Sequence, residues 1–155
     1  GFSHGHAGLL IAAWPAAVVV VAPIAGRLIS RYPAGILGSI GLVMLSLGLL
    51  LLALLPDRAG SVDIAWRLAL CGAGFALFQS PNNHTLVMSA PLSRAGAASG
   101  MLGTARLTGQ SIGAAMVAIV FAFFEGARGA DVAFVLGAAM ALVAAGFSAM
   151  RLRQR

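Results

Sequence analysis

The chain has 155 residues and a net charge of +6; 60% of its residues are hydrophobic and only 9% are charged. Soluble domains are nearer half apolar and a quarter charged, so this composition excludes a disordered protein and argues against a water-soluble globule. The single cysteine excludes a disulfide scaffold and a cysteine-rich metal site. The basic residues are arginines scattered singly or in pairs, so nucleic acid is not an expected partner. The remaining class is an integral membrane protein, in contact with the lipid bilayer.

Five long segments that are nearly free of charge predict membrane-spanning helices. About 20 helical residues cross a hydrocarbon core that is about 30 Å thick. The spans are therefore expected at about 7–26, 35–55, 64–88, 97–124 and 131–150. The connections are short and contain Pro or Gly, so consecutive spans should be antiparallel neighbours. The predicted fold class is an all-α membrane bundle of five transmembrane helices.

The connecting segments differ in charge between the two sides of the membrane. One side holds six arginines and no acid: Arg27, Arg31, Arg94, Arg151, Arg153 and Arg155. The other side holds three arginines and all four acids: Arg58, Arg67, Arg128, Asp57, Asp63, Glu125 and Asp131. The positive-inside rule makes the first side cytoplasmic. We expect a multi-pass protein of the cell (inner) membrane with its N-terminus outside, its C-terminus in the cytoplasm and at least one preceding helix missing.

Polar side chains gather near the cytoplasmic end of the 64–88 span. Gln79, Asn82 and Asn83 follow Phe75 and Phe78. Polar groups at membrane depth must face protein or a water-filled cavity, so these five residues are candidates for lining a substrate cavity. A proline within the cluster removes one helical N–H and loosens the helix there. The alternative is a helix end that frays into the cytoplasmic interface, where amides are well solvated.

Arg106 and Gln110 lie one turn apart in the 97–124 span. Arg106 is about 15 Å from the cytoplasmic end of that helix, near the middle of the membrane. An arginine at this depth costs about 2.5–3.5 kcal/mol on insertion scales, and no acid of this chain lies at a similar depth to pair with it. Both residues are candidates for the substrate cavity. The alternative for Arg106 is a snorkelling or interhelical structural role.

Small residues repeat along one face of the same span. Gly100, Ala105, Gly109 and Gly113 leave a shallow surface on which a neighbouring backbone can approach closely. The pattern predicts tight packing against another helix.

The motifs of common enzyme classes are absent from the sequence. It contains no P-loop, no H-E-x-x-H, no dinucleotide motif and no paired carboxylates. His4 and His6 supply two potential ligands, which do not make a zinc site. We expect no catalytic residues, no metal and no cofactor, and the chain is not predicted to be an enzyme.

Three segments resemble one family of membrane proteins. The sequence GRLISRY at 26–32 resembles the cytoplasmic loop signature G-x-L-x-D-R-x-G-R-R of the major facilitator superfamily. Gly26 and Arg31 match that signature, Arg27 adds a second positive charge, and Ser30 replaces its aspartate. The segments GAGFALFQSPNN (72–83) and SGMLGTARLTGQSIGAA (99–115) are similar to the fourteen-helix drug–proton antiporter branch.

This resemblance implies a C-terminal fragment of a transporter, carrying the last five helices of its second bundle. The third span would line the central cavity, the first and fourth would contact the missing N-terminal half, and the second and fifth would support them. The parent would export small amphiphilic or cationic drugs in exchange for protons by alternating access, and the proton-carrying acids would lie in the missing half. The alternatives are a non-transporting helix-packing module and a passive pore.

Overall fold

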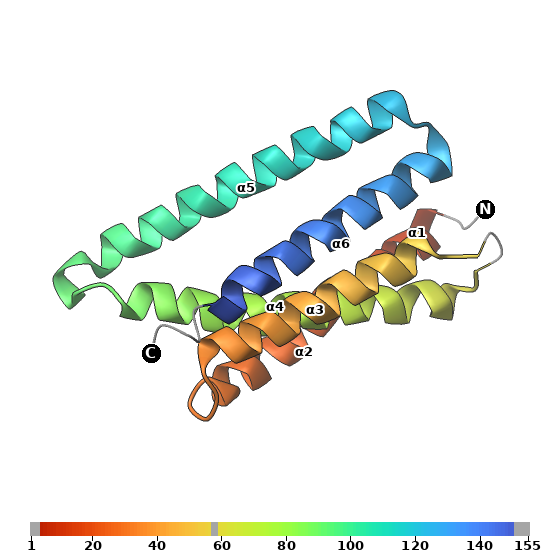
Figure 1. Ribbon diagram of the computed structural model, residues 1–155. Coiled ribbons are helices and arrows are strands. Elements are labelled where there is room, and N and C mark those ends of the chain that lie inside the picture. The colour runs from red at the N-terminus through yellow and green to blue at the C-terminus, as the bar shows by residue number, and fades with distance from the viewer. Residues whose placement is uncertain (1–3, 57–58, 151–155) are drawn as a thin grey trace.

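The computed structural model describes residues 4–56 and 59–150, and over these residues the chain is helical (Figure 1). The elements are α1 (His4–Ile11), α2 (Ala13–Leu28), α3 (Ala34–Ala53), α4 (Ser61–Met88), the short 3₁₀ helix η1 (Leu92–Arg94), α5 (Ala95–Phe123) and α6 (Gly126–Met150). The side chains of the two N-terminal histidines lie outside the described part, as do both residues at positions 57–58 and the three arginines of the C-terminal tail.

Five helical segments are long and apolar enough to cross a membrane: Gly8–Leu28, Ala34–Ala53, Ser61–Met88, Leu92–Phe123 and Gly126–Met150. The first of these segments begins within α1 and continues to the end of α2. The prediction of an all-α membrane fold with five spans is confirmed. Several helices extend beyond the charge-free runs, and α6 begins at Gly126 instead of near 131. Its first turns carry Arg128 and Asp131, both exposed, because the end of a helix near the interface keeps charged side chains in water.

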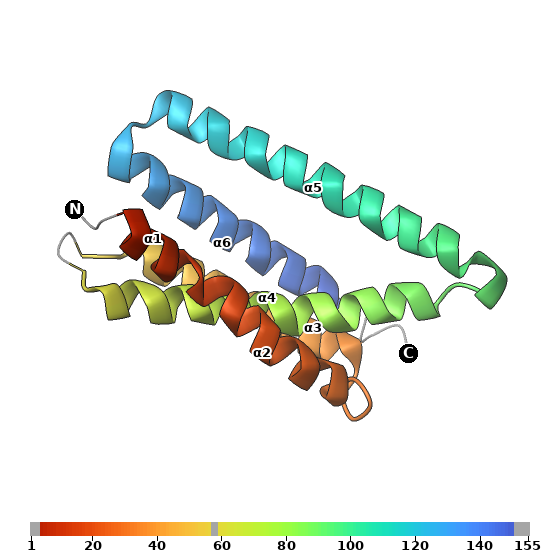
Figure 2. The same ribbon diagram turned by 180° about the vertical axis from the view of Figure 1, so that it is seen from behind.

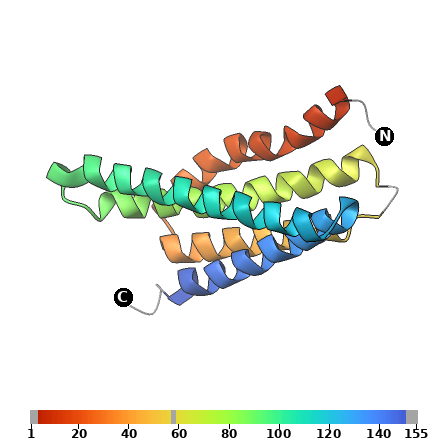
Figure 3. The same ribbon diagram turned by 90° about the horizontal axis from the view of Figure 1, so that it is seen from above.

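α4 is the central helix of a packed unit. It contacts α3 on one side and α2 on another, and α6 packs on α3 (Figures 1 and 2). α5 is different: among its described residues only Val120 is buried, and the helix has few contacts with α4 and α6. Seen from above, α5 passes over the other helices as a separate layer (Figure 3). The fold is therefore a tight unit of α2, α3, α4 and α6 with α5 held loosely beside it.

The seam between α3 and α4 is built on glycine. A Cβ added at Gly41 would lie 2.6 Å from both the Gly74 carbonyl oxygen and the Phe78 amide nitrogen, so the two backbones are nearly in contact there. About two turns further on, a Cβ at Gly48 would lie 2.5 Å from Cys71 Sγ. Small residues let helices approach closely where lipid provides no hydrophobic driving force between them. These glycines fix the position of α4 against α3.

Serine hydroxyls join α3 to α6. Three hydroxyls donate to carbonyls across the seam: Ser46 Oγ to Ala138 O at 2.9 Å, Ser39 Oγ to Ala145 O at 3.3 Å and Ser148 Oγ to Gly35 O at 3.3 Å. Ser46 and Ser148 are each only 1% exposed, so their hydroxyls are shielded from water, whereas Ser39 is part-buried and also donates to the Gly35 carbonyl of its own helix at 2.8 Å. Each interhelical bond of this kind contributes roughly 0.6 kcal/mol in membranes.

The turn between α5 and α6 is very short. Gly126 has a φ of 58°, a left-handed conformation that favours glycine. Gly129 follows one turn into α6, where a Cβ would lie 2.6 Å from the Phe124 carbonyl oxygen and 2.8 Å from the Phe121 ring. This turn holds the C-terminal end of α5 against α6.

Candidate substrate cavity

A cavity of about 520 Å³ lies between α4 and α5. Its lining residues come from these two helices alone: Phe75, Phe78, Gln79, Asn82, Asn83, Leu86, Leu102, Ala105, Arg106, Gly109 and Gln110. All seven residues that the sequence suggested for a substrate cavity are among them. A volume of this size is within the range of sites for drug-sized molecules.

On the α4 side, the lining residues recur at the spacing of one helix face. α4 continues as a helix through Pro81 as far as Met88, so the polar cluster lies on a formed helix and not on a frayed end. The Thr85 hydroxyl donates to the Pro81 carbonyl at 2.9 Å, within this part of the helix. The amides of Gln79 and Asn82 are therefore held on one defined face, toward α5.

The two aromatic residues of the cavity wall are held in place by the packed unit. The Phe75 ring lies 6.0 Å from the ring of Trp14 on α2, with 45° between the ring planes. The backbone of Phe78 lies against Gly41 of α3, and a Cβ at Gly38 would be 3.6 Å from Phe78 Cδ2. Because α2 and α3 fix these positions, the apolar wall of the cavity is preformed.

On the α5 side, Leu102, Ala105, Arg106, Gly109 and Gln110 again share one face. Arg106 is about 16 Å along α5 from the start of that helix, counted at 1.5 Å per residue. No acid lines the cavity, and the acids among the described residues lie at the other end of the bundle, at Asp63, Glu125 and Asp131. The cavity therefore presents one positive charge beside amide groups and two aromatic rings.

The glycine face of α5 has no partner among the described residues. A Cβ added at Gly100, Gly109 or Gly113 would meet nothing within 4 Å. Ala105 and Gly109 border the cavity, and Gly113 borders a smaller cavity of about 120 Å³ between α5 and α6. The sequence prediction that this face packs tightly against a helix is therefore not met within the described chain, while glycines of α3 and α4 that it did not single out form the close packing.

Arg67 has a structural role that the sequence did not indicate. The charge pattern counted it with the side that holds the acids, and the predicted span 64–88 includes it; in the structure it lies in α4 and its Nη1 donates to the Leu51 carbonyl, in the last turn of α3, at 2.7 Å. Its guanidinium carbon is 5.4 Å from the centroid of the Trp66 ring, and its Nε is buried without a hydrogen-bond partner among the described residues. A positive charge at the end of a helix also complements the helix dipole.

Comparison with known proteins identifies the family of this chain. The sequence model of the family described as Major Facilitator Superfamily matches residues 1–114, which is most of the chain. The chain belongs to the major facilitator superfamily. It is 51% identical over 154 residues to the uncharacterized transporter YebQ of Escherichia coli, covering 99% of this chain and 34% of YebQ. It is 37% identical over 122 residues to the multidrug resistance protein Stp of Mycobacterium tuberculosis, covering 79% of this chain and 22% of Stp. No solved structure matches at a significant level.

Two conclusions follow from membership in the major facilitator superfamily. Its members are membrane transporters, so the expectation that the chain is not an enzyme is confirmed. The chain also spans only about a third of the length of YebQ and about a fifth of Stp. The matched region is thus one part of a longer chain in these relatives.

The loop that resembles the superfamily signature lies at the end of α2. Ser30, at the position of the signature aspartate, donates its hydroxyl to the Arg27 carbonyl at 2.7 Å, and Arg27 and Arg31 border a surface depression there. Gly26 lies in the same final turn with open space around its Cα. The described residues at this end of the bundle carry Arg27, Arg31 and Arg94 and no acid.

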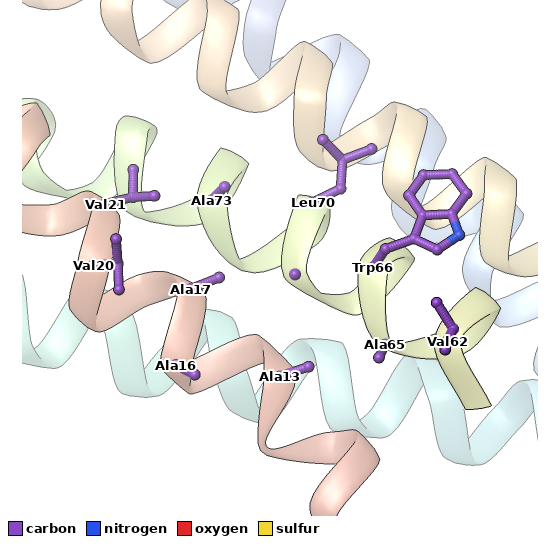
Figure 4. A pocket seen from close by; sticks show the side chains of 11 residues that line it. Ala13, Ala16, Ala17, Val20, Val21, Val62, Ala65, Trp66, Leu70 and Ala73 are labelled. Carbon is purple, nitrogen blue, oxygen red and sulfur yellow. The ribbon is translucent and has the colours of Figure 1, made fainter.

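A second and larger cavity lies between α2 and α4, with a volume of about 810 Å³ (Figure 4). Its walls are small or branched apolar side chains, among them Ala17, Val20 and Leu70, and the indole of Trp66. Because it offers almost no polar group that could orient a substrate, it fits apolar contact with lipid or protein. The cavity between α4 and α5 is the better candidate for recognition.

Proposed function

We propose that this chain is the C-terminal part of a transporter of the fourteen-helix drug–proton antiporter branch, and that the parent protein exports small amphiphilic molecules in exchange for protons. The observation that carries the proposal is the cavity between α4 and α5. It brings an arginine, four amides and two aromatic rings together between two helices that are long and apolar enough to cross a membrane. The similarity to Stp, a protein named for multidrug resistance, supports the drug-efflux part of the proposal.

The mechanism is alternating access by two bundles that rock against each other. The tight seams around α4 suit a unit that moves as one body, since the α3–α4 backbones are nearly in contact and serine bonds tie α3 to α6. α5 is exposed along most of its length, which fits a helix that contacts the other half of the parent. Its face at Gly100, Ala105, Gly109 and Gly113 is the proposed contact surface.

The proton-carrying acid is supplied by the part of the parent outside this chain. Asp63, Glu125 and Asp131 lie at the ends of helices, far from the cavity, so none of them is placed to exchange a proton beside a bound substrate. The end of the bundle with Arg27, Arg31 and Arg94 is proposed to face the cytoplasm, with Gly26, Arg27 and Arg31 forming the loop motif there. A cationic drug, which the resemblance also implies, would need a carboxylate from outside this chain as its partner.

Transport by the full-length parent in everted membrane vesicles tests the proposal. Respiration is used to acidify the vesicle interior, a panel of amphiphilic compounds is added, and a dye reports the pH gradient. We expect some compounds to dissipate the gradient only in vesicles that contain the transporter. Flux that persists after the gradient is collapsed would indicate a passive pore. No compound-dependent proton movement and no efflux would favour the non-transporting helix-packing module.

A further inference from the structure

The charge inside the cavity has one sign. Among its eleven lining residues, Arg106 is the only one with an ionisable side chain, and the other polar groups are the neutral amides of Gln79, Asn82, Asn83 and Gln110. Glu125 is about 28 Å further along the chain at 1.5 Å per residue, and Asp63 is about 24 Å from Gln79 along α4. Within the described chain no carboxylate can therefore reach Arg106.

A lone guanidinium at membrane depth attracts anions and repels cations. Arg106 is exposed within the described chain, and a hydrogen bond from its guanidinium to an anion is roughly twice as strong as a bond between neutral groups. A guanidinium also offers parallel N–H groups that match the two oxygens of a carboxylate. The amide of Gln110 lies one helical turn from Arg106 on the same wall and provides a further N–H donor.

The aromatic residues lie on the facing wall. Phe75 and Phe78 come from α4, opposite Arg106 on α5, so a flat ring between the helices can contact them while its substituent points to the guanidinium. The packing of Phe75 on Trp14 and of Phe78 on α3 means that this wall needs little rearrangement on binding. The two walls together match a molecule with one aromatic ring system and one anionic group.

We propose that the cavity binds aromatic amphiphiles with a single carboxylate, which Arg106 holds through its guanidinium. This narrows the substrate class of the proposed function and rests on it. Cations are excluded from the α4–α5 cavity by the same charge. The competing arrangement is a carboxylate on a helix outside this chain that pairs with Arg106 permanently, and the experiment separates the two.

Binding to the purified full-length transporter is measured by calorimetry at pH 7 with three probes of the same shape: 2-naphthoate, 2-naphthamide and 2-naphthylmethylammonium. We expect 2-naphthoate to bind about ten- to a hundredfold more tightly than the ammonium probe, the range for a hydrogen-bonded charged group. Arg106→Gln should reduce 2-naphthoate binding to that of 2-naphthamide. Arg106→Lys should keep part of the preference for 2-naphthoate, because lysine keeps the positive charge but lacks the parallel N–H groups of the guanidinium. Arg128→Gln, an exposed arginine at the other end of the bundle, is the matched control and should change nothing.

Two results would overturn the proposal. One is tighter binding of the ammonium probe to the unaltered protein. The other is an Arg106→Gln variant that keeps its 2-naphthoate affinity and gains affinity for the ammonium probe, which is the result expected if a carboxylate of the parent is released from Arg106. Binding of 2-naphthamide serves as the folding control. If Arg106→Gln no longer binds 2-naphthamide, the Arg106→Lys variant is used in its place. An Arg106→Lys variant that still binds 2-naphthamide but does not prefer 2-naphthoate over the ammonium probe also counts against the proposal.

The test is independent of transport itself. A preference for 2-naphthoate without proton-coupled flux of any compound would refute the proposed function and leave the anion site standing. Proton-coupled export of cationic compounds, together with no preference for 2-naphthoate in binding, would support the proposed function and refute the anion site.

Discussion

Replacing Gly41 by alanine should separate α3 from α4. The new Cβ would lie 2.6 Å from two backbone atoms of α4, about 0.8 Å closer than the 3.4 Å at which ordinary contact begins. Neither atom can rotate away, so the helices must move apart. Overpacking of this kind costs about 1–3 kcal/mol, and we expect the upper part of that range. Alanine recovers about 1 kcal/mol through its better helix propensity, which leaves a net loss of about 2 kcal/mol.

Gly146→Ala is the matched control for this substitution. Gly146 is also inside a long helix, but a Cβ there would meet nothing within 4 Å, so the same substitution should show only the gain of about 1 kcal/mol in helix propensity. The two variants of the full-length protein should therefore differ by about 3 kcal/mol. Thermal unfolding in detergent, followed by size-exclusion chromatography, ranks them, with Gly41→Ala melting below and Gly146→Ala at or above the unaltered protein.

The effect should reach the cavity, because Phe78 contributes both the backbone atom that meets Gly41 and a side chain of the cavity wall. Gly41→Ala should therefore weaken substrate binding in protein that remains folded, whereas Gly146→Ala should not. Equal melting temperatures for the two variants would show that α3 and α4 are not in backbone contact at this point, and the argument for a rigid unit around α4 would fail.

Three further outcomes are expected. Gly113→Leu should lower the amount or activity of the full-length transporter, since the proposed partner of this face needs the space; a fully active variant would mean that the face meets lipid. Arg67→Met should destabilise the protein by about 1–3 kcal/mol in thermal or denaturant unfolding, because the carbonyl at the end of α3 loses a charged donor; no change would mean that water replaces the bond. Arg128→Cys should react with an impermeant thiol reagent from outside the cell, and Arg94→Cys only after permeabilisation; the reverse pattern would invert the proposed orientation.

The positions of the helices and the grouping of the cavity residues are both accessible from the sequence. Runs without charge locate the helices because a charged side chain in hydrocarbon is costly. The residues of α4 that line the cavity repeat every three or four positions, and the consecutive helices α4 and α5 are antiparallel, which lets Gln79 and Arg106 lie at a similar depth. The structure places both on one cavity. This grouping depends only on helical periodicity and chain order, which a single sequence contains.

The contacts between helices cannot be predicted from the sequence in the same way. The sequence drew attention to Gly109 and Gly113, because they have the G-x-x-x-G spacing, yet a Cβ at either would meet nothing within 4 Å, while Gly41, Gly72 and Gly74 lie against the backbone of a neighbouring helix. Which glycine meets a neighbour depends on the rotation of each helix about its axis, and spacing along one helix does not fix that rotation. The hydrogen bond from Arg67 to a carbonyl of α3 cannot be predicted for a similar reason. Every residue has a backbone carbonyl, and the sequence does not indicate which of them accepts the bond.

The contrast between α4 and α5 also bears on how the cavity works. α4 is fixed on two sides by α2 and α3, so its aromatic and amide groups keep their positions. α5 carries the charge but has few contacts with α4 and α6, and its small face is open. If α5 packs against the other half of the parent, as proposed above, Arg106 changes position when that contact changes. In a transporter of two rocking halves, the distance between Arg106 and the α4 wall would then follow the motion of the halves, and substrate affinity would change with it on the two sides of the membrane.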